Sequence, residues 1–361
     1  MEAGKVSNEA RDTCRVAYII HFLLGVGNLL PWNAFITAVD YFDYLYPTNH
    51  IEKVFSVAYM VSSVVVLLVM MSWGNWSKTT LRMRMNLGFS MFVMSLTVTS
   101  VVDWASGSTK LKERFCGFTV AAVVICGLAD GLVAGSLIGS AGKLPKQYMQ
   151  AVFAGTASSG IIISILRIVT KASLPQTPKG LQISAHLYFM VATIFLLCCI
   201  ILCNLQYKLP VMQHYQQLFL QENTLCSGFI AEDLKSNVLK DWYPILLITV
   251  YNFADLLGKS LTAFHVLQSI TKAIWASTAR LLFYPLFIVC LHGPKWLKTE
   301  VPMMFLTFLL GFTNGYFTSV LMILTPKSVS FSESELSAIV MTAFLGFGLV
   351  GGSVLGWFWI L

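Results

Sequence analysis

Charged residues are scarce in this chain. Asp, Glu, Lys and Arg make up 11% of its 361 residues, whereas 56% are hydrophobic. A soluble domain carries about 25% charged residues, so this chain lacks the charge that would cover a surface in water. The sequence therefore predicts an integral membrane protein. Its net charge of +7 does not indicate nucleic acid binding, because the Lys and Arg residues fall between apolar runs, where they set topology.

Signatures of soluble enzymes and energy-driven pumps are also missing. The chain contains no G-x-x-x-x-G-K-[ST] and no H-E-x-x-H, so it is neither an ATP-driven pump by itself nor a zinc protease of that type. The pair Gly25 and Gly27 lacks the third glycine of a dinucleotide fingerprint. Around Ser159 the sequence resembles an intramembrane serine protease motif only loosely, because Ala157 stands where that motif has glycine. An enzyme embedded in the membrane is the runner-up class, and no catalytic residue is predicted.

The eight cysteines include no C-x-x-C pair, and most of them lie inside apolar runs, where cysteine acts as a small hydrophobe. We therefore predict neither a disulfide framework nor a metal site, and no cofactor. The polar N-terminal stretch MEAGKVSNEARDTCR precedes a long, interrupted apolar run, so we expect no cleavable signal peptide.

The chain contains many long apolar runs. A membrane-spanning helix needs about 20 mostly apolar residues, and no strand-like alternation is sustained. The runs cover residues 16–39, 54–73, 87–102, 115–141, 149–169, 183–205, 243–267, 274–291, 301–325 and 336–361. The sequence thus predicts an all-α, polytopic membrane helical bundle of about ten transmembrane helices.

Basic residues orient the first half of this bundle. They occur in the N-terminal tail, after the second run and after the fourth run, so the positive-inside rule places these three stretches on the cytoplasmic side. Lys171 and Lys179, after the fifth run, break the pattern. The stretch 207–242 is mixed in charge, and its apolar piece is too short to span. We expect an N-terminal half of six helices at 1–206, a central loop at 207–242 and a C-terminal half of about four helices at 243–361.

Small residues recur every fourth position in several spans, which lets helix backbones approach closely in lipid. Helix packing is the simpler interpretation, and it is also compatible with two bundles that rock against each other. The predicted packing glycines are Gly127, Gly131, Gly135 and Gly139 in the fourth span and Gly348, Gly352 and Gly356 in the last.

The first span contains polar groups that an anchor would not need. Pro31 removes a backbone hydrogen bond and favours a kink, and Trp32 and Asn33 follow it directly. Polar residues in a span usually face a protein interior or a wet cavity. Two interpretations remain: this segment lines a substrate path, or Trp32 lies at the membrane interface while Asn33 bonds a neighbouring helix.

Ionisable residues at membrane depth are the second group of candidates. Asp255 and Lys259 are four apart, on one face of a helix, and Asn252 adds a polar group to that face. They indicate a gate or a substrate and proton contact, or else a static pair that fixes the orientation of the helix. Arg280 opens the next span and either pairs with Asp255 or extends to the interface.

Three further titratable groups lie within or near the ends of spans. Asp130 is either a proton-titrating carboxylate or a group satisfied by backbone and serine partners, and Asp40 is a second candidate for proton transfer or gating. We expect Arg167 to extend to the membrane interface. His21 is expected to be a satisfied structural residue.

Five stretches together resemble the signature of the equilibrative nucleoside transporter family, solute carrier family 29. They are LLPWNAFITAVDYF, AGSLIGSAGKLP, YNFADLLGKSLTA, ARLLFYP and GFTNGYFTSVLMILTPKSV, and they occur in the order found in the family. The phrases LPKQYMQAVFAGTASSGIIIS and KASLPQTP resemble the plant branch.

The resemblance implies a major-facilitator-like bundle with a central cavity between two halves. Such a protein transports purine and pyrimidine nucleosides, such as adenosine and uridine, by alternating access. Plant members are often described as proton-coupled, so protons are an implied second partner. We expect a multi-pass protein in the lipid bilayer of the plasma membrane or of a vacuolar or other internal membrane.

The cavity residues of the family map to Trp32 and Asn33 and to Asp255 with Lys259. Animal relatives commonly have arginine where this chain has Lys259, so a bidentate clamp does not follow here. Some carry glutamine where this chain has Ala134, and the hypothesis is that Asp130, one turn earlier, compensates. The nucleobase is expected near Trp32 and the ribose hydroxyls at Asp255.

One departure from the family is large. The family has eleven helices, and where the seventh is expected this chain has only ENTLCSGFIAED. Loss of one span inverts everything that follows it, unless a short segment re-enters the membrane. The alternative function is therefore a truncated variant that does not transport and only associates with full-length relatives through its glycine stripes.

Overall fold

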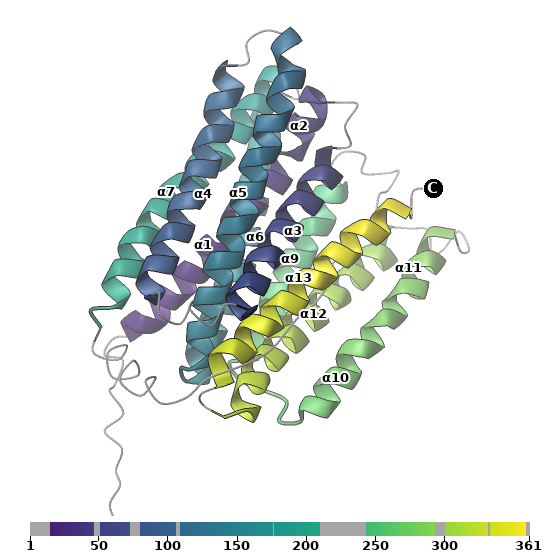
Figure 1. Ribbon diagram of the computed structural model, residues 1–361. Coiled ribbons are helices and arrows are strands. Elements are labelled where there is room, and N and C mark those ends of the chain that lie inside the picture. Colours follow the sequence, from purple (N-terminus) through teal and green to yellow (C-terminus); the bar gives the residue numbers. More distant parts are fainter. Residues whose placement is uncertain are drawn as a thin grey trace, which may run out of the picture.

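The computed structural model describes residues 15–46, 51–72, 80–105, 109–175, 177–209, 243–292, 300–330 and 333–358, and every regular element in these ranges is a helix (Figure 1). In chain order the elements are α1 (Val16–Thr37), α2 (Val39–Leu45), α3 (Ile51–Ser72), α4 (Leu81–Ala105), α5 (Thr109–Gly142), α6 (Lys146–Ser173), α7 (Pro178–Gln206), α9 (Tyr243–Leu261), α10 (Ile270–Ala279), the 3-10 turn η5 (Arg280–Leu282), α11 (Phe283–His292), α12 (Glu300–Ser328) and α13 (Ser334–Phe358). The predicted all-α fold is confirmed, as lipid requires of a backbone that must satisfy its own polar groups.

Each predicted span coincides with a helix, and the eighth coincides with α10, η5 and α11 in succession. In the part of the chain that the structure describes, seven helical stretches are long and apolar enough to cross a membrane: 16–37, 51–72, 116–142, 146–173, 178–206, 301–328 and 334–351. The helices α4 and α9, which carry charged residues, are not among them, nor are α10 and α11, which have 10 residues each. Pro31 lies inside α1, which continues through it to Thr37.

The N-terminal helices α1–α7 pack closely through glycine. On the contact between α1 and α6, a methyl group added at Gly25 would collide with the Val152 carbonyl, and one added at Gly155 would collide with the Phe22 carbonyl. Each helix thus offers a glycine to the backbone of the other. This reciprocal contact fixes α1, with its polar residues, against α6.

The glycine stripe predicted on α5 is a packing surface. Gly127 and Gly131 lie against backbone carbonyls of α3, and Gly135 lies against side chains of the same helix. Gly139 lies instead against Ile339 of α13. The glycine stripe of α5 therefore contacts two helices, α3 and α13, and α13 belongs to the C-terminal helices.

The stripe predicted on the last span is only partly visible. Gly348 is buried in α13, whereas the surroundings of Gly352 and Gly356 lie outside the described residues. The glycine of α13 that meets a N-terminal helix is Gly346, which lies beside Val64 of α3.

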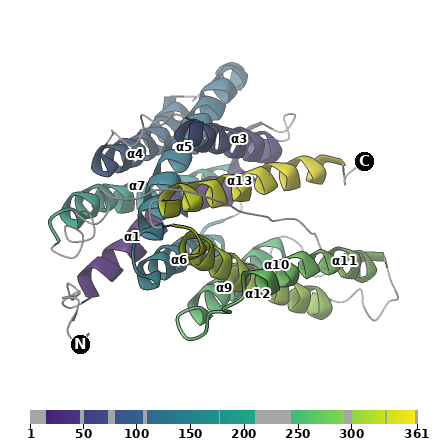
Figure 2. The ribbon, with the colours of Figure 1, turned by 60° about the horizontal axis from the view of Figure 1, so that its bottom comes forward.

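The C-terminal helices α9–α13 are organised around α9 and α12. Gly311 lies against the Tyr251 backbone and Gly315 against the Asp255 backbone, so both helices advance by one turn in the same direction. They are therefore parallel. Figures 1 and 2 show α10 and α11 at the outer edge of the molecule, beside α12.

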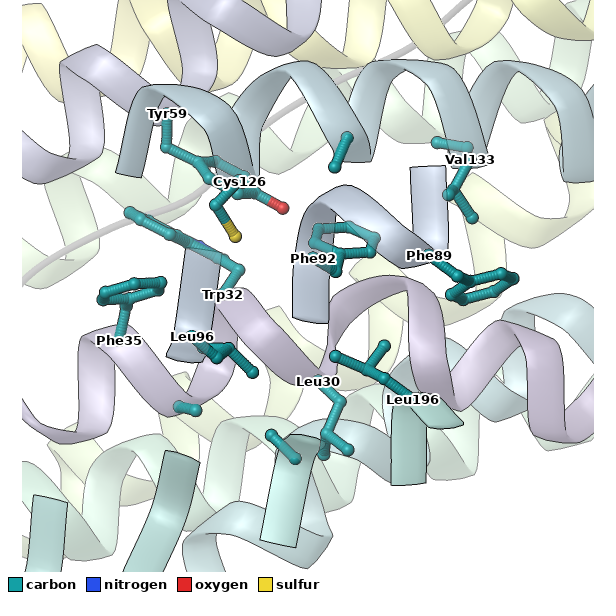
Figure 3. Packing of buried hydrophobic residues seen from close by; sticks show 14 of the residues in the cluster. Leu30, Trp32, Phe35, Tyr59, Phe89, Phe92, Leu96, Cys126, Val133 and Leu196 are labelled. Atoms are coloured by element: carbon teal, nitrogen blue, oxygen red, sulfur yellow. The ribbon is translucent and has the colours of Figure 1, made fainter. Parts of the chain in front are cut away.

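The main contacts between the N-terminal and C-terminal helices are those of α6 with α9 and of α13 with α3 and α5. Smaller contacts join α12 to α6 and α5. Figure 2 shows α13 lying between the group of α3, α4 and α5 and the group of α9, α10 and α12. The larger buried cluster of apolar side chains extends mainly through the N-terminal helices (Figure 3).

The contacts at helix ends define the direction of the second half. His21, near the start of α1, contacts Gln206 at the end of α7, and its ring lies 5.1 Å from that of Tyr148 at the start of α6. Gln150, also near the start of α6, donates a hydrogen bond to the Thr262 carbonyl just after α9. The end of α9 thus lies on the side where α1 begins, which we call the N-terminal side.

It follows that α9 and α12 end on the N-terminal side, and α13 begins there. The second half is therefore not inverted relative to the orientation implied by the family resemblance, because α7 ends and α9 begins on opposite faces of the bundle. Residues 210–242, where a remnant of a lost helix was predicted, lie outside the described residues.

Candidate functional site

Asp255 is the centre of a charged network on the C-terminal helices. Its Oδ2 pairs with Lys259 Nζ at 2.7 Å, so the ion pair predicted from the i,i+4 spacing is formed. Its Oδ1 accepts a hydrogen bond of 3.0 Å from the Asn314 side-chain amide of α12. Arg280 of η5 donates a bond of 2.7 Å to the Asn314 carbonyl oxygen. We call these four residues the Asp255 network.

Arg280 fits neither of the two alternatives drawn from the sequence. It does not pair directly with Asp255, and it does not extend to an interface on its own, because Asn314 lies between the two charged groups. Asn314 was missed as a site residue. The available signal was an amide in the middle of an apolar span, within the GFTNGYF stretch that carries the family resemblance.

The polar face predicted for α9 is divided between two neighbours. The side chain of Asn252 donates a 3.1 Å bond to Ser164 of α6 and lies against Gly160, whereas Asp255 and Lys259 form the network with α12 and η5. Three residues of helix correspond to a rotation of about 300°, which is about 60° short of a full turn, so Asn252 and Asp255 lie on one broad face but contact different helices. The predicted polar face of α9 therefore contacts α6 through Asn252 and α12 through Asp255.

Trp32 and Asn33 lie on α1 in different surroundings. The Trp32 indole stacks on Tyr59 of α3, with ring centroids 4.2 Å apart and planes 16° from parallel, and it is only 7% exposed (Figure 3). Trp32 therefore does not anchor the chain at a lipid interface. Asn33 donates a 2.8 Å hydrogen bond to Ser159 of α6, as the packing interpretation predicted for Asn33.

These two groups of residues meet at α6. Asn33 binds Ser159, and the next residue along the helix, Gly160, contacts Asn252 of α9. The amides of Asn33 and Asn252, from opposite halves of the sequence, thus reach adjacent positions of one helix. The helix α6 thus contacts polar residues of both α1 and α9.

Asp130 forms a separate buried cluster inside the N-terminal helices. Its carboxylate accepts a 2.7 Å bond from the Ser63 hydroxyl and a longer one, 3.5 Å, from the Asn28 amide. The Tyr59 hydroxyl lies close to the Asp130 carboxyl, outside the geometry of a hydrogen bond. We call these four residues the Asp130 cluster. The serine partner of the second sequence interpretation is present.

Asp40 and Arg167 form an ion pair of 2.6 Å between α2 and α6. Arg167 is 11% exposed and is held by Asp40, whose side chain is 50% exposed. The extension of Arg167 to the membrane interface stays a prediction. His21 is fully buried and satisfied by the Ala17 carbonyl and Gln206, as predicted.

A third charged cluster joins the two parts of the chain on the N-terminal side. Glu335, at the start of α13, pairs with Arg84 of α4 at 3.2 Å and with Lys143, just after α5. We call these three residues the Glu335 cluster. Sequence reasoning missed it, because its members are far apart in the chain and only the basic ones stood out as topology signals.

Comparison with known proteins assigns this architecture to a family. The family profile described as "Nucleoside transporter" matches residues 120–228 and 219–361. The chain is 58% identical over 380 residues to equilibrative nucleotide transporter 8 of Arabidopsis thaliana, covering 98% of this chain and 97% of that protein. It is 45% identical over 402 residues to equilibrative nucleotide transporter 1 of the same plant, covering 99% and 89%.

The chain belongs to the nucleoside transporter family. It is thus a member of a transporter family and not an enzyme, and the predicted plant affinity is confirmed. Among solved structures, the human organic anion transporter MFSD10 (TETRAN) superposes with a TM-score of 0.53 at 13% identity, over 95% of this chain and 91% of that one. At this identity the likeness shows the fold alone, which is the major-facilitator-like bundle expected from the resemblance.

The transporter relatives are longer than this chain within the aligned range. The alignments extend over 380 and 402 positions, although the chain has 361 residues, so each relative contains residues that this chain lacks. The two segments matched by the family profile overlap at 219–228, within the stretch where the seventh helix of the family was expected.

Proposed function

We propose that this protein moves purine and pyrimidine nucleosides, such as adenosine and uridine, across a membrane by alternating access. The N-terminal half (1–206) and the C-terminal half (243–361) would rock about the contacts of α6 with α9 and of α13 with α3 and α5. The observation that carries the proposal is the Asp255 carboxylate, which is buried on α9 and bonded through both oxygens. The membrane is the plasma membrane or a vacuolar or other internal membrane.

The geometry of Asp255 suits a ribose ring. A carboxylate offers about four lone-pair positions, and Lys259 and Asn314 occupy one on each oxygen. One acceptor position per oxygen is left for the neighbouring hydroxyls of a ribose, which donate to an ionised group in strong hydrogen bonds. Lys259 contributes a point charge that orients the carboxylate.

The nucleobase is proposed to lie beside Trp32. Tyr59 covers one face of the indole, so a base would stack on the remaining face or against the edge of the Trp32–Tyr59 pair. Offset stacking of this kind contributes about 0.5–1.5 kcal/mol beyond burial. The Asn33 amide, already bonded to Ser159, lies next to Trp32 in the chain and can offer its carbonyl oxygen to a base.

Proton coupling is the second part of the proposal, and Asp130 is its candidate group. Its partners Ser63 and Asn28 are neutral, whereas Asp40 is paired with Arg167 and Arg280 is held at Asn314. Asp40 and Arg280 are therefore better suited to gating. Tyr59 lies beside the Asp130 carboxyl and stacks on Trp32. A change of charge at Asp130 would therefore act, through Tyr59, on the residue that is proposed to stack on the base.

A second function is favoured by the alignment lengths. Since both relatives contain residues that this chain lacks, it could be a product that inserts into the membrane without transporting and associates with a full-length relative. The close glycine contacts of α5 are already occupied by α3 and α13, which leaves this stripe without a free surface for a partner.

Uptake of labelled adenosine into proteoliposomes separates the two functions. The purified chain is reconstituted, its insertion is verified, and initial rates are measured with and without a pH gradient. Saturable uptake that excess uridine inhibits supports transport. Absence of uptake by the verified inserted chain would overturn it in favour of the second function.

A further inference from the structure

Asn314 is the only described residue that contacts both Asp255 and Arg280 through hydrogen bonds. Its amide nitrogen donates to the Asp255 carboxylate at 3.0 Å, and its carbonyl oxygen accepts from the Arg280 guanidinium at 2.7 Å. Only one orientation of the carboxamide satisfies both partners, because a carboxylate cannot donate and a guanidinium cannot accept. The two charged neighbours therefore fix the orientation of Asn314, and Asn314 in turn fixes theirs.

Arg280 depends on Asn314 for its place in the network. It lies in η5, at the junction of α10 and α11, and its Nε atom is buried without a hydrogen-bond partner in the described chain. The guanidinium thus has a single side-chain partner, Asn314, within the described network. The hydrogen-bond link between Arg280 and the Asp255 carboxylate therefore runs through Asn314, and no direct ion pair joins the two in the described part of the chain.

Helix packing does not require the carboxamide of Asn314. Glycines on both sides already hold α9 and α12 together: Gly258 lies against the Phe312 carbonyl, and Gly311 and Gly315 lie against the backbone of α9. Loss of one side-chain hydrogen bond on α12 would leave this backbone contact in place. Loss of the Asn314 hydrogen bond would instead change the position of Asp255 Oδ1, because Lys259 holds only Oδ2.

We propose that Asn314 is a positioning residue of the substrate site: it orients the Asp255 carboxylate for the nucleoside and transmits the influence of Arg280 to it. The inference rests on the proposed function, because it assumes that Asp255 binds the ribose. In the network, Lys259 orients Oδ2 by charge, and Asn314 orients Oδ1 by a directional hydrogen bond. With both oxygens fixed, the Asp255 carboxylate offers two acceptors in one plane to the two neighbouring hydroxyls of the ribose.

The test compares adenosine binding and transport for Asn314→Leu, Asn314→Gln, Arg280→Gln and the Asn314→Leu/Arg280→Gln double variant. Leucine has nearly the shape of asparagine and no hydrogen-bonding group, whereas glutamine keeps both the donor and the acceptor. The matched control is Ser319→Ala on the same helix, which removes a buried hydroxyl that has no partner in the described structure. Each variant is purified, and its thermal stability is compared with that of the parent.

Asn314→Leu is expected to raise the dissociation constant for adenosine about tenfold, since a hydrogen bond to a charged group is lost. The maximal transport rate should stay within about twofold, and Asn314→Gln should recover most of the affinity. Because Arg280 acts through Asn314, the double variant should bind no more weakly than Asn314→Leu alone.

Three results would overturn the inference. One is unchanged affinity in Asn314→Leu while Asp255→Asn abolishes binding, which leaves the proposed function intact. Another is a dissociation constant in the double variant that is raised by the product of the two single fold changes, which would mean that Arg280 acts independently of Asn314. The third is no adenosine binding by the parent protein, which would overturn the proposed function together with the inference.

Discussion

Replacing Glu335 by glutamine is expected to open the N-terminal side of the bundle. Glu335 is the shared partner of Arg84 and Lys143, so its loss leaves two cations side by side without their anion. Next to it, Gly142 lies against the Ser334 carbonyl and Ala338, which closes the end of α5 on the start of α13. The Glu335 cluster therefore stabilises the arrangement in which the two halves meet on this side.

The burial of the three side chains sets the magnitude of the expected shift between the closed and open arrangements. Arg84 and Lys143 are 8% and 9% exposed, and Glu335 is 20% exposed. Removing one partner of a buried pair costs about 3–5 kcal/mol, and the partial exposure of Glu335 places the effect near the lower limit. At about 3 kcal/mol, the equilibrium between the closed and open arrangements shifts roughly 100-fold towards the open one.

Thiol labelling measures this shift. Ser337 is fully buried two residues after Glu335, and its hydroxyl has no partner in the described structure, so Ser337→Cys is a small change. A membrane-impermeant maleimide should label this cysteine much faster in the Glu335→Gln background than in the parent. Glu333→Gln is the control, because Glu333 is exposed and outside the cluster. Equal labelling rates in all three backgrounds would refute the reasoning.

Three further outcomes are expected. Gly155→Ala places a methyl group on the Phe22 carbonyl and should lower the free energy of unfolding by about 1–3 kcal/mol; thermal unfolding checks this against Gly117→Ala, where the space is open. Asp130→Asn should abolish the dependence of adenosine uptake on a pH gradient, and full retention would show that Asp130 is not the coupling group. Trp32→Leu should weaken adenosine binding about tenfold through loss of stacking, and unchanged binding would place the base elsewhere.

Local rules predicted the elements that depend on neighbours in sequence. The ten apolar runs became helices, because a backbone in lipid must satisfy its own polar groups. The pair of Asp255 and Lys259 followed from four-residue spacing, which places two side chains on one face of a helix whatever surrounds it. The glycine stripe of α5 predicted close packing for the same reason.

Contacts between distant segments could not be predicted in this way. Asn314 lies 59 residues from Asp255, and Glu335 lies 251 residues from Arg84. Nothing local shows which neighbouring helix a side chain will meet, so the alternatives for Arg280 stayed open until Asn314 was found between it and Asp255. The sequence likewise did not show that one face of α9 contacts α6 through Asn252 and α12 through Asp255.

The orientation of the second half is a separate prediction of the structure. Because α13 begins on the N-terminal side, the two ends of the chain should lie on opposite sides of the membrane. Accessibility of epitope tags at both termini in sealed vesicles checks this. Both tags on one side would mean that the C-terminal half is inverted.

Adenosine uptake by proteoliposomes that contain either the parent chain or Asp255→Asn tests the central claim most directly. Asparagine keeps the shape of the side chain but removes the charge that Lys259 and Asn314 hold in place. We predict saturable uptake by the parent and a loss of apparent affinity of at least about tenfold in the variant. Equal uptake by both, or uptake by neither when insertion is verified, would contradict the account.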